Sequence, residues 1–255
     1  MLTRQQITSI KALGQSKERK QQHLFLAEGP KLVGELISSG FVIEQVYGVQ
    51  EWQMENRSLL NKQIFKFTSI TQGELSRIST LVTPNQVVAI AQLPVYERDE
   101  SLLSQDLTLY LDGIKDPGNL GTILRIADWF GIKQVFCSIG SVDAFSPKVV
   151  QSTMGSIFRI KVFYEKPDLF FHSLPETLPV YGAFLEGEPL NQVALEKAAV
   201  IVIGSESHGI SQAVADFIST KVRIPSWPAS HSGQSAESLN ASVATGILCY
   251  AFRNA

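Results

Sequence analysis

The sequence lacks the features that mark secreted, membrane-spanning and disordered proteins. It has only two cysteines, Cys137 and Cys249, which are too few for a disulfide framework and favour a reducing compartment. No run of about 18 apolar residues is present, so a spanning helix is not expected. Residues 1–20 contain no apolar stretch of the kind found in signal peptides. With 44% hydrophobic and 18% charged residues among 255, the composition is that of a folded protein, and we expect it in the cytoplasm.

Two kinds of ligand site are also missing from the sequence. The four histidines (His23, His172, His208 and His231) and the two cysteines show no metal-ligand spacing, so no metal is expected. No G-x-G-x-x-G follows an expected strand, so the usual dinucleotide-binding turn is not supported.

Charge is nearly balanced over the whole chain but not at its N-terminus. The net charge is −2, whereas residues 1–31 hold six basic side chains against two acidic ones. Lys17, Arg19 and Lys20 form the densest basic group in this arm. They are either an electrostatic footprint for phosphate or a solvated helix face, and charge alone does not separate these interpretations.

Apolar patterning predicts two α/β domains. Residues 1–95 mix helical and strand-like patterns, residues 96–106 form a polar, acidic linker, and residues 107–255 repeat β–α units. In the first domain we expect helices at 5–13 and 30–38, a short apolar run at 24–26, and strands at 41–48 and 87–93. In the second we expect strands at 107–114, 134–139, 159–164, 179–184, 199–204 and 221–224, and helices at 121–130, 147–155, 167–174, 211–218 and 237–252. Near-continuous apolar strands, such as VIVIG at 200–204, predict a parallel sheet covered by helices. Trp52 and Trp129 are expected to be packing residues.

Three expected loops follow strands of the second domain, within residues 111–131, 200–211 and 223–250. Ligands of open α/β sheets bind at such carboxyl ends. Each loop alone is common architecture, because an acid or an asparagine near a helix start usually serves the helix itself. The residues of interest in the three loops are, in chain order, Asn119, Arg125, Gly204, Glu206, Gly209, Ile224, Pro225, Ser238, Leu239 and Asn240.

Taken together and in order, these loops resemble the motifs of the SpoU family, also called the TrmH family, of RNA ribose 2′-O-methyltransferases. The matching runs are DPGNLGTILRIADWFG, IVIGSESHGIS, and RIP followed by SLNASVATGIL. The N-terminal runs RKQQHLFLAEGPKLVGELI and LVTPNQVVAIAQLP are similar to the family's substrate domain. The resemblance covers nearly the whole chain.

The resemblance implies a C-terminal SPOUT-type parallel α/β sheet with a trefoil knot, preceded by a smaller L30e/L7Ae-like α/β domain that binds the RNA substrate. It implies S-adenosylmethionine as the cofactor, and a homodimer through the knotted domain. Membrane and metal partners are not expected. By motif match, the residues implied around the cofactor are Ile203, Gly204, Ile224, Pro225 and Leu239. The implied catalytic residues are Asn119, Arg125, Glu206, Ser238 and Asn240. Because the family's N-terminal domains bind RNA, the resemblance favours the interpretation of Lys17, Arg19 and Lys20 as RNA contacts.

The implied reaction is the in-line attack of a ribose 2′-hydroxyl on a sulfonium methyl group, and its main needs are alignment and help for a weakly acidic nucleophile. Arg125 matches the arginine that the family places at the 2′-hydroxyl, and its role as a base or as an electrostatic stabiliser is open. Because a guanidinium rarely gives up its proton, we favour a grip on the phosphate and stabilisation of the alkoxide. Asn119 would orient Arg125 or the ribose, and Glu206 would fix that geometry by accepting hydrogen bonds.

One segment departs from the family pattern. Residues 226–237 make the link between Ile-Pro and Ser-Leu-Asn longer than usual, and Ser226 replaces the usual methionine. The segment is either a substrate loop, with Trp227 stacking on a base, or a surface loop.

Other functions are weighed against this one. The two-domain layout favours ribosomal RNA as the substrate over transfer RNA. A catalytically silent RNA-binding protein is the alternative if the insertion closes the cofactor site. A hydrolase built on Ser207, Asp216 and His231 is disfavoured, because the three residues lie very close in sequence.

Overall fold

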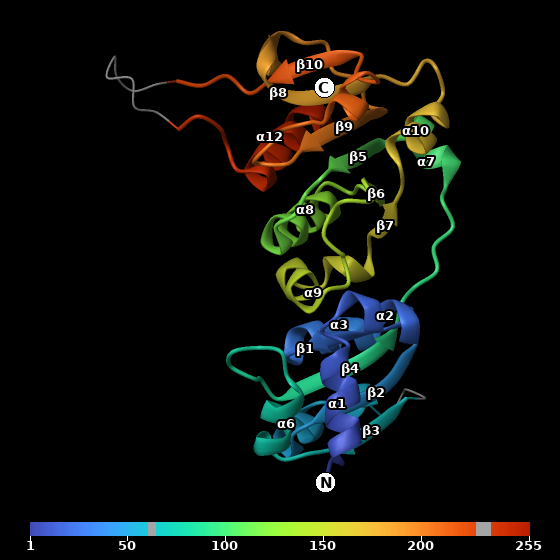
Figure 1. Ribbon diagram of the computed structural model, residues 1–255, viewed down its shortest axis with the longest axis vertical. Helices are drawn as coiled ribbons and strands as arrows, with labels where there is room; N and C mark the ends of the chain where they lie inside the picture. Colours follow the sequence, from blue (N-terminus) through green and yellow to red (C-terminus); the bar gives the residue numbers. More distant parts are fainter. Residues whose placement is uncertain (61–64, 228–235) are drawn as a thin grey trace. The chain divides into compact units, whose positions relative to one another are not determined.

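The computed structural model describes residues 1–60, 65–227 and 236–255, and it divides into two compact units (Figure 1). Unit 1 comprises Met1–Val95 and Asp143–Arg159, and unit 2 comprises Tyr96–Val142 and Ile160–Ala255. The chain therefore passes between the units three times.

Unit 1 is built on a four-stranded mixed sheet with the strand order β1-β4-β2-β3. β4 is antiparallel to β1 and β2, whereas β3 is parallel to β2. The strands are β1 (Leu24–Glu28), β2 (Ile43–Gly48), β3 (Lys66–Ser69) and β4 (Val87–Gln92). The helices are α1 (Arg4–Ala12), α2 (Ser16–Gln22), α3 (Pro30–Ser38), α4 (Gln50–Glu55), α5 (Arg57–Leu60), α6 (Gln72–Ile78), α9 (Pro147–Thr153) and the 3-10 turn η1 (Ser156–Phe158). Phe25, Leu36, Trp52 and Leu75 are buried in its core, as expected for Trp52.

Residues 143–159 differ from the expected division, which placed them in the second domain. In the structure they pack on unit 1, where α9 contacts β1. The Phe145 ring lies 4.9 Å from that of Phe25, and Arg159 forms an ion pair with Glu35 at 2.6 Å. The reason is apolar burial: this segment supplies aromatic side chains to a core that β1 leaves open on one face.

Unit 2 is built on a six-stranded sheet with the order β10-β8-β9-β5-β6-β7, and all of its strand pairs are parallel. The strands are β5 (Leu107–Asp112), β6 (Gln134–Cys137), β7 (Lys161–Tyr164), β8 (Val180–Pro189), β9 (Ala199–Gly204) and β10 (Thr220–Arg223). The helices are α7 (Glu100–Gln105), α8 (Pro117–Trp129), α10 (Pro167–His172), α11 (Gln212–Ala215), α12 (Ala241–Arg253) and the 3-10 turn η2 (Leu190–Gln192). α8 and α12 pack side by side (Figure 1). The central strands β5 and β9 are almost entirely buried. The parallel sheet expected from the apolar strands is confirmed.

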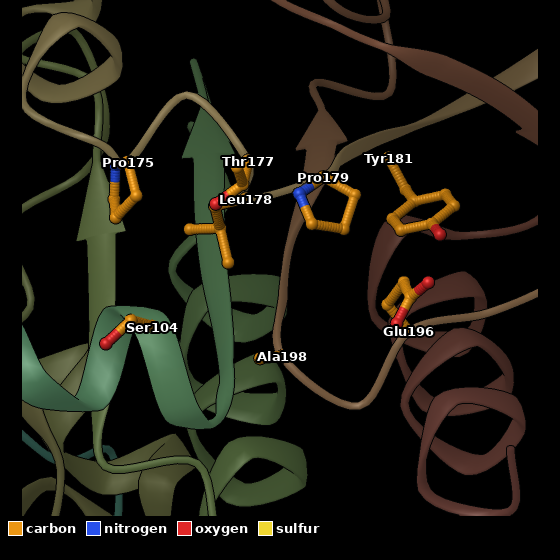
Figure 2. Close-up of a pocket in the computed structure, with 8 residues that line it drawn as sticks. All are labelled: Ser104, Pro175, Thr177, Leu178, Pro179, Tyr181, Glu196 and Ala198. Atoms are coloured by element: carbon orange, nitrogen blue, oxygen red, sulfur yellow. The ribbon is translucent and has the colours of Figure 1, made fainter.

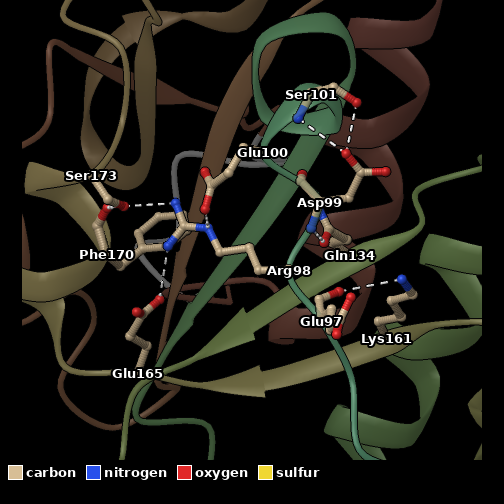
Figure 3. A network of polar contacts seen from close by, with 10 residues as sticks. All are labelled: Glu97, Arg98, Asp99, Glu100, Ser101, Gln134, Lys161, Glu165, Phe170 and Ser173. Atoms are coloured by element: carbon tan, nitrogen blue, oxygen red, sulfur yellow. Dashed lines mark hydrogen bonds and ion pairs between the residues drawn. The ribbon is translucent and has the colours of Figure 1, made fainter.

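Residues 96–106 were expected to be a linker, but in the structure they are attached to unit 2 (Figure 3). The Gln134 side chain exchanges two hydrogen bonds with the Asp99 backbone, at 2.8 and 2.9 Å. Arg98 forms ion pairs with Glu100 and Glu165, and its guanidinium also lies over the Phe170 ring. Residues 98–100, expected in a linker, are therefore bonded to residues of unit 2.

Candidate active site

The three loops singled out in the sequence follow β5, β9 and β10 of unit 2. Because the sheet is parallel, the carboxyl ends of these strands lie at one edge. β5 and β9 are direct neighbours, and Asp112 pairs with Gly204 at their ends. The fold thus brings the first two loops together.

Asn119, Glu206 and Asn240, one from each loop, form a hydrogen-bonded cluster. Asn119 Nδ2 donates to Glu206 Oε1 at 2.5 Å, and Asn240 Nδ2 donates to the same oxygen at 2.7 Å. Asn240 Nδ2 also lies 2.9 Å from Asn119 Oδ1, which accepts from it. Two amides converging on one carboxylate oxygen fix the direction of that carboxylate, which is the arrangement of a pre-organised polar site. We call these three residues the amide–carboxylate cluster.

Asn119 is held by the start of α8. The helix begins at Pro117, not near residue 121 as expected, and Asp116 is its N-cap. The Asp116 carboxylate accepts a hydrogen bond from the Asn119 backbone N–H at 2.8 Å. Because Asp116 caps the helix, the Asn119 side chain is left to reach Glu206. Sequence reasoning missed Asp116, although Asp before Pro at a helix start is a recognisable signal.

Asn240 is held by the start of α12. This helix begins at Ala241, later than expected, and Asn240 Oδ1 caps it by accepting from the Ser242 N–H at 2.9 Å and the Ser242 hydroxyl at 2.6 Å. With its oxygen committed to the cap, the amide nitrogen of Asn240 points to Glu206.

Glu206 stands in a tight turn that follows β9. Ser205 and Gly209 exchange backbone hydrogen bonds at 3.0 and 2.8 Å, and Gly209 has a φ of 65°. A Cβ added at Gly204 would collide with the backbone of Gly209 and Ile210. The turn is anchored to the first loop, because the Ser211 N–H donates to the Asp112 carboxylate at 2.7 Å. Gly204 is therefore required by the closure of this turn.

Arg125 lies on the exposed side of α8. Within residues 1–60, 65–227 and 236–255, no side chain or carbonyl forms a hydrogen bond or ion pair with its guanidinium. Ser238 is exposed two residues before Asn240 and is not joined to the cluster by a hydrogen bond among the described residues. Arg125 is thus available to a ligand.

The residues implied around the cofactor differ in how deeply they are buried. Ile203 is buried within β9, whereas Ile224 and Pro225 are half-buried just beyond β10. Leu239 is 48% exposed next to Asn240. The insertion at 226–237 is described only in part: Trp227 is exposed, and residues 228–235 with His231 lie outside the described residues.

The prediction that three basic residues near the N-terminus contact RNA needs a correction at one of them. Lys17 and Lys20 are exposed on α2, but Arg19 is buried at 2% and its guanidinium is paired with Asp143 at 2.5 Å. A buried, paired guanidinium does not contact RNA, so Arg19 was wrongly expected to do so.

Among the described residues, which do not include His231, the hydrolase alternative finds no support. Ser207 Oγ lies 2.7 Å from Nδ1 of the adjacent His208, and Asp216 accepts from Gln212 at 2.6 Å. Neither contact forms a nucleophile–base–acid relay.

A hollow of about 400 Å³ lies away from the cluster in unit 2 (Figure 2). Leu178, Pro179 and Ala198, which line it, precede β8 and β9 and so mark the amino ends of these strands.

In the described part of the chain, no group of three or more His, Cys, Asp or Glu side chains could hold a metal ion. None of the described helices is long and apolar enough to cross a membrane.

The protein has a parallel α/β sheet with a polar cluster at the carboxyl ends of its strands. This is where α/β enzymes bind their ligands, so the fold and the cluster define an α/β protein with an enzyme-like ligand site. The chain belongs to the SpoU rRNA Methylase family, whose family model matches residues 106–250. A second family model, the MRM3-like substrate binding domain, matches residues 4–89. The resemblance stated from the motifs is thereby confirmed.

Similar proteins are known by sequence and by structure. The 23S rRNA (guanosine(2553)-2′-O)-methyltransferase RlmP of Bacillus subtilis is 30% identical over 251 residues, which cover 98% of this chain and 96% of that protein. A solved structure from Porphyromonas gingivalis, assigned to the TrmH family of RNA methyltransferases, is 38% identical, covers 100% of both chains and has a TM-score of 0.85. The AdoMet-bound rRNA methyltransferase of Sinorhizobium meliloti is 28% identical, with 100% of this chain and 96% of that chain covered and a TM-score of 0.86.

Proposed function

We propose that this protein transfers a methyl group from S-adenosylmethionine to a ribose 2′-hydroxyl of ribosomal RNA. The observation that supports this most is the amide–carboxylate cluster of Asn119, Glu206 and Asn240, with Arg125 exposed on α8, in a chain of the SpoU family. The similar proteins from Bacillus subtilis and Sinorhizobium meliloti agree, because their names describe rRNA methylation and, for the second, bound AdoMet.

The residues present fit S-adenosylmethionine. An adenosine needs apolar contact and backbone hydrogen bonds, and the loops that hold Gly204, Ile224 and Leu239 offer half-buried or exposed apolar side chains beside the turn closed by Gly209. The Glu206 carboxylate suits a cationic sulfonium nearby. When bound, the cofactor supplies an electrophilic methyl group whose leaving group is a neutral thioether.

The chain's own residues align and stabilise the reacting ribose. Arg125 binds the adjacent phosphate and stabilises the negative charge that develops on the 2′-oxygen as its proton passes to solvent water. Glu206 Oε1 accepts from two amides, so its second oxygen is left to accept a hydrogen bond from the ribose. Asn119 and Asn240 hold Glu206 in that direction, and Ser238 completes the polar wall before α12.

Unit 1 is proposed to hold the RNA substrate, in keeping with its match to a substrate binding domain. The exposed Lys17 and Lys20 of α2 are the proposed phosphate contacts. In this proposal unit 1, with its two segments Met1–Val95 and Asp143–Arg159, forms the substrate domain, and unit 2 forms the methyltransferase domain.

A homodimer through a knotted unit 2 is part of the proposal. Val243, Ile247 and Tyr250 are exposed at helical spacing on α12, and Trp129 at the end of α8 is 83% exposed rather than packed as expected. Large exposed apolar side chains on two adjacent helices are typical of a protein–protein interface.

We place the protein in the cytoplasm, where ribosomal RNA is modified and where the free thiols of Cys137 and Cys249 remain reduced.

The test is methyl transfer from labelled S-adenosylmethionine to unmodified ribosomal RNA, comparing the native protein with Arg125→Ala. Methylation of a 2′-oxygen prevents its attack on the neighbouring phosphate, so the expected product is an alkali-resistant labelled dinucleotide. Arg125→Ala is expected to lower the rate by at least about 100-fold, with an unchanged melting temperature because Arg125 has no partner among the described residues.

Other outcomes of this assay identify other functions. Label in alkali-labile mononucleotides would mean base methylation. Label on transfer RNA alone would establish the transfer RNA alternative. No label on naked RNA or on ribosomal subunits, with RNA binding retained, would mean a catalytically silent RNA-binding protein.

A further inference from the structure

Ser138 directly follows β6, at the edge of unit 2 where the carboxyl ends of β5 and β6 lie side by side. The residue is buried, and its Oγ accepts a hydrogen bond from the Gly113 N–H at 2.8 Å. Its own N–H donates to the Leu111 carbonyl oxygen at 2.9 Å. One serine therefore binds both β5 and the first residue of the loop that leaves this strand.

Gly113 needs the Ser138 hydroxyl because it lies where the sheet ends. β6 ends at Cys137, which pairs with Leu111, so β6 does not continue beside Gly113. Gly113 has a φ of 68°, a left-handed conformation that glycine adopts without strain and that turns the chain out of the strand. A backbone N–H left without an acceptor in a half-buried position is costly, and the Ser138 hydroxyl supplies the acceptor.

The loop that begins at Gly113 lies between two other loops of unit 2. On one side the Val142 N–H donates to the Ile114 carbonyl oxygen at 2.8 Å, which adds a second bond to the loop that follows β6. On the other side a Cβ added at Gly113 would lie 3.9 Å from the Cβ of Ser205, which belongs to the turn that carries Glu206. The position of Gly113 thus sets how the first loop of the candidate site lies against the second.

Gly113 also lies three residues before the N-cap of α8. Asp116 is that cap and accepts from the Asn119 N–H at 2.8 Å, while the Asn119 side chain donates to Glu206 at 2.5 Å. Ile114, between Gly113 and the cap, is buried. A shift of Gly113 is therefore passed to Asn119 through a short stretch of anchored chain.

We propose that Ser138 is a positioning residue for the methyl-transfer site. Its hydroxyl fixes Gly113, and Gly113 fixes the start of α8 and with it the Asn119 amide. Ser138 acts through Gly113 and contacts neither the RNA nor the cofactor. The inference rests on the proposed function only in assigning Asn119 to the methyl-transfer site.

The test compares Ser138→Ala with Ser141→Ala in the full-length chain. Ser141 is the matched control, because it lies in the same loop and loses the same hydroxyl group. Its Oγ is 3.4 Å from Ser138 Oγ and 3.4 Å from the Leu111 carbonyl oxygen, which is long for a hydrogen bond of a hydroxyl. The control variant leaves the bond between Ser138 and Gly113 in place.

The first readout is amide hydrogen exchange at residues 113–119, which requires no methylation. We expect faster exchange in Ser138→Ala and native exchange in Ser141→Ala. The second readout is the single-turnover rate at saturating S-adenosylmethionine and unmodified ribosomal RNA, which should fall about 10-fold to 100-fold in Ser138→Ala alone. The dissociation constants of both should change by less than about twofold, because the variant disturbs alignment and not binding.

Three results would overturn the positioning role. The first is native exchange at 113–119 in folded Ser138→Ala. The second is a lower melting temperature with a native rate at saturation, as expected of a hydroxyl that only stabilises the fold. The third is an equal rate loss in Ser141→Ala, which would assign the effect to the whole loop. If Ser138→Ala does not fold, Ser138→Cys carries the test, because a thiol is a weak acceptor of similar size.

The two readouts keep this inference separate from the proposed function. If the unaltered protein methylates no RNA, the proposed function fails. The exchange experiment then still decides whether the Ser138 hydroxyl holds Gly113 and the start of α8, because it depends on neither RNA nor S-adenosylmethionine.

Discussion

Asn240 and Glu206 are joined by a hydrogen bond of 2.7 Å from the Asn240 amide nitrogen, while the Asn240 amide oxygen caps α12. The two ends of one amide are committed to different tasks. The start of the last helix and the direction of the Glu206 carboxylate are therefore set by the same side chain, and changes at residue 240 can separate the two tasks.

Asn240→Asp is the variant that separates them. Asp keeps an oxygen for the cap but removes both amide donors and puts a carboxylate beside Glu206. We expect the single-turnover methylation rate to fall at least about 100-fold, with a loss of unfolding free energy below about 1 kcal/mol. Denaturant unfolding and rapid-quench kinetics measure the two. In Asn240→Ala the cap is lost as well, and the stability loss should be larger. An Asp variant with native turnover would contradict the role given to the cluster.

Gly204→Ala is expected to open the turn that carries Glu206. The added Cβ would meet the backbone of Gly209 and Ile210, which cannot give way as a flexible side chain would. We expect a loss of about 1 to 3 kcal/mol in the free energy of unfolding and weaker S-adenosylmethionine binding by calorimetry. The control is Gly34→Ala in α3, where a Cβ would meet nothing within 4 Å. That variant should be more stable by about 0.5 to 1 kcal/mol, and its cofactor binding should be native.

The double variant Lys17→Gln/Lys20→Gln is expected to weaken RNA binding without changing cofactor binding. Each lysine that neutralises a phosphate releases counterions, so the slope of log K against log salt should become shallower by about 1.4 to 1.8. Fluorescence titration at several salt concentrations measures it. Lys66→Gln, a change at an exposed lysine of β3, serves as the comparison. An equal effect of this control would mean that unit 1 attracts RNA by general charge, without a contact at α2.

Stability is expected to decline at alkaline pH because of two buried thiols. Burial raises the pKa of Cys137 to about 12 and that of Cys249 to about 12, above the ordinary 9.0. The folded state therefore favours the neutral thiol; its advantage is complete below pH 9 and is lost as the pH rises toward 12. Each thiol contributes a slope of about 1.4 kcal/mol per pH unit in that window. Replacing both cysteines with alanine should flatten the profile of unfolding free energy between pH 9 and 11. A profile of unchanged steepness would mean that other groups cause the decline.

The order of elements could be predicted from the sequence more readily than their ends. Apolar runs located β5, β9 and α3, because burial on one or both faces leaves a clear pattern. The start of α8 was predicted four residues too late. Pro117 and Gly118 were interpreted as a turn, but Pro is also favoured in the first turn of a helix, and α8 begins at Pro117. Helix α2 was missed, since its short polar sequence has only Arg19 buried.

The residues of the amide–carboxylate cluster could be predicted from the order of the motifs, whereas their mutual contacts are seen only in the folded structure. No local pattern states that Asn119 and Asn240, 121 positions apart, meet. Arg19 shows the limit of charge-based reasoning: in sequence it is one of three basic residues, and only tertiary structure supplies Asp143 as its partner. Trp129 shows the same limit for apolar residues, because a helix end leaves it exposed.

The excursion of residues 143–159 into unit 1 means that neither unit is a continuous stretch of chain. A fragment cut at residue 95 would leave β1 without Phe145, and the remainder would carry Phe145 and Ile157 with no core to enter. Both pieces would expose aromatic and aliphatic surface and would be prone to aggregate. Exchange of the substrate domain between relatives therefore has to transplant two segments at once.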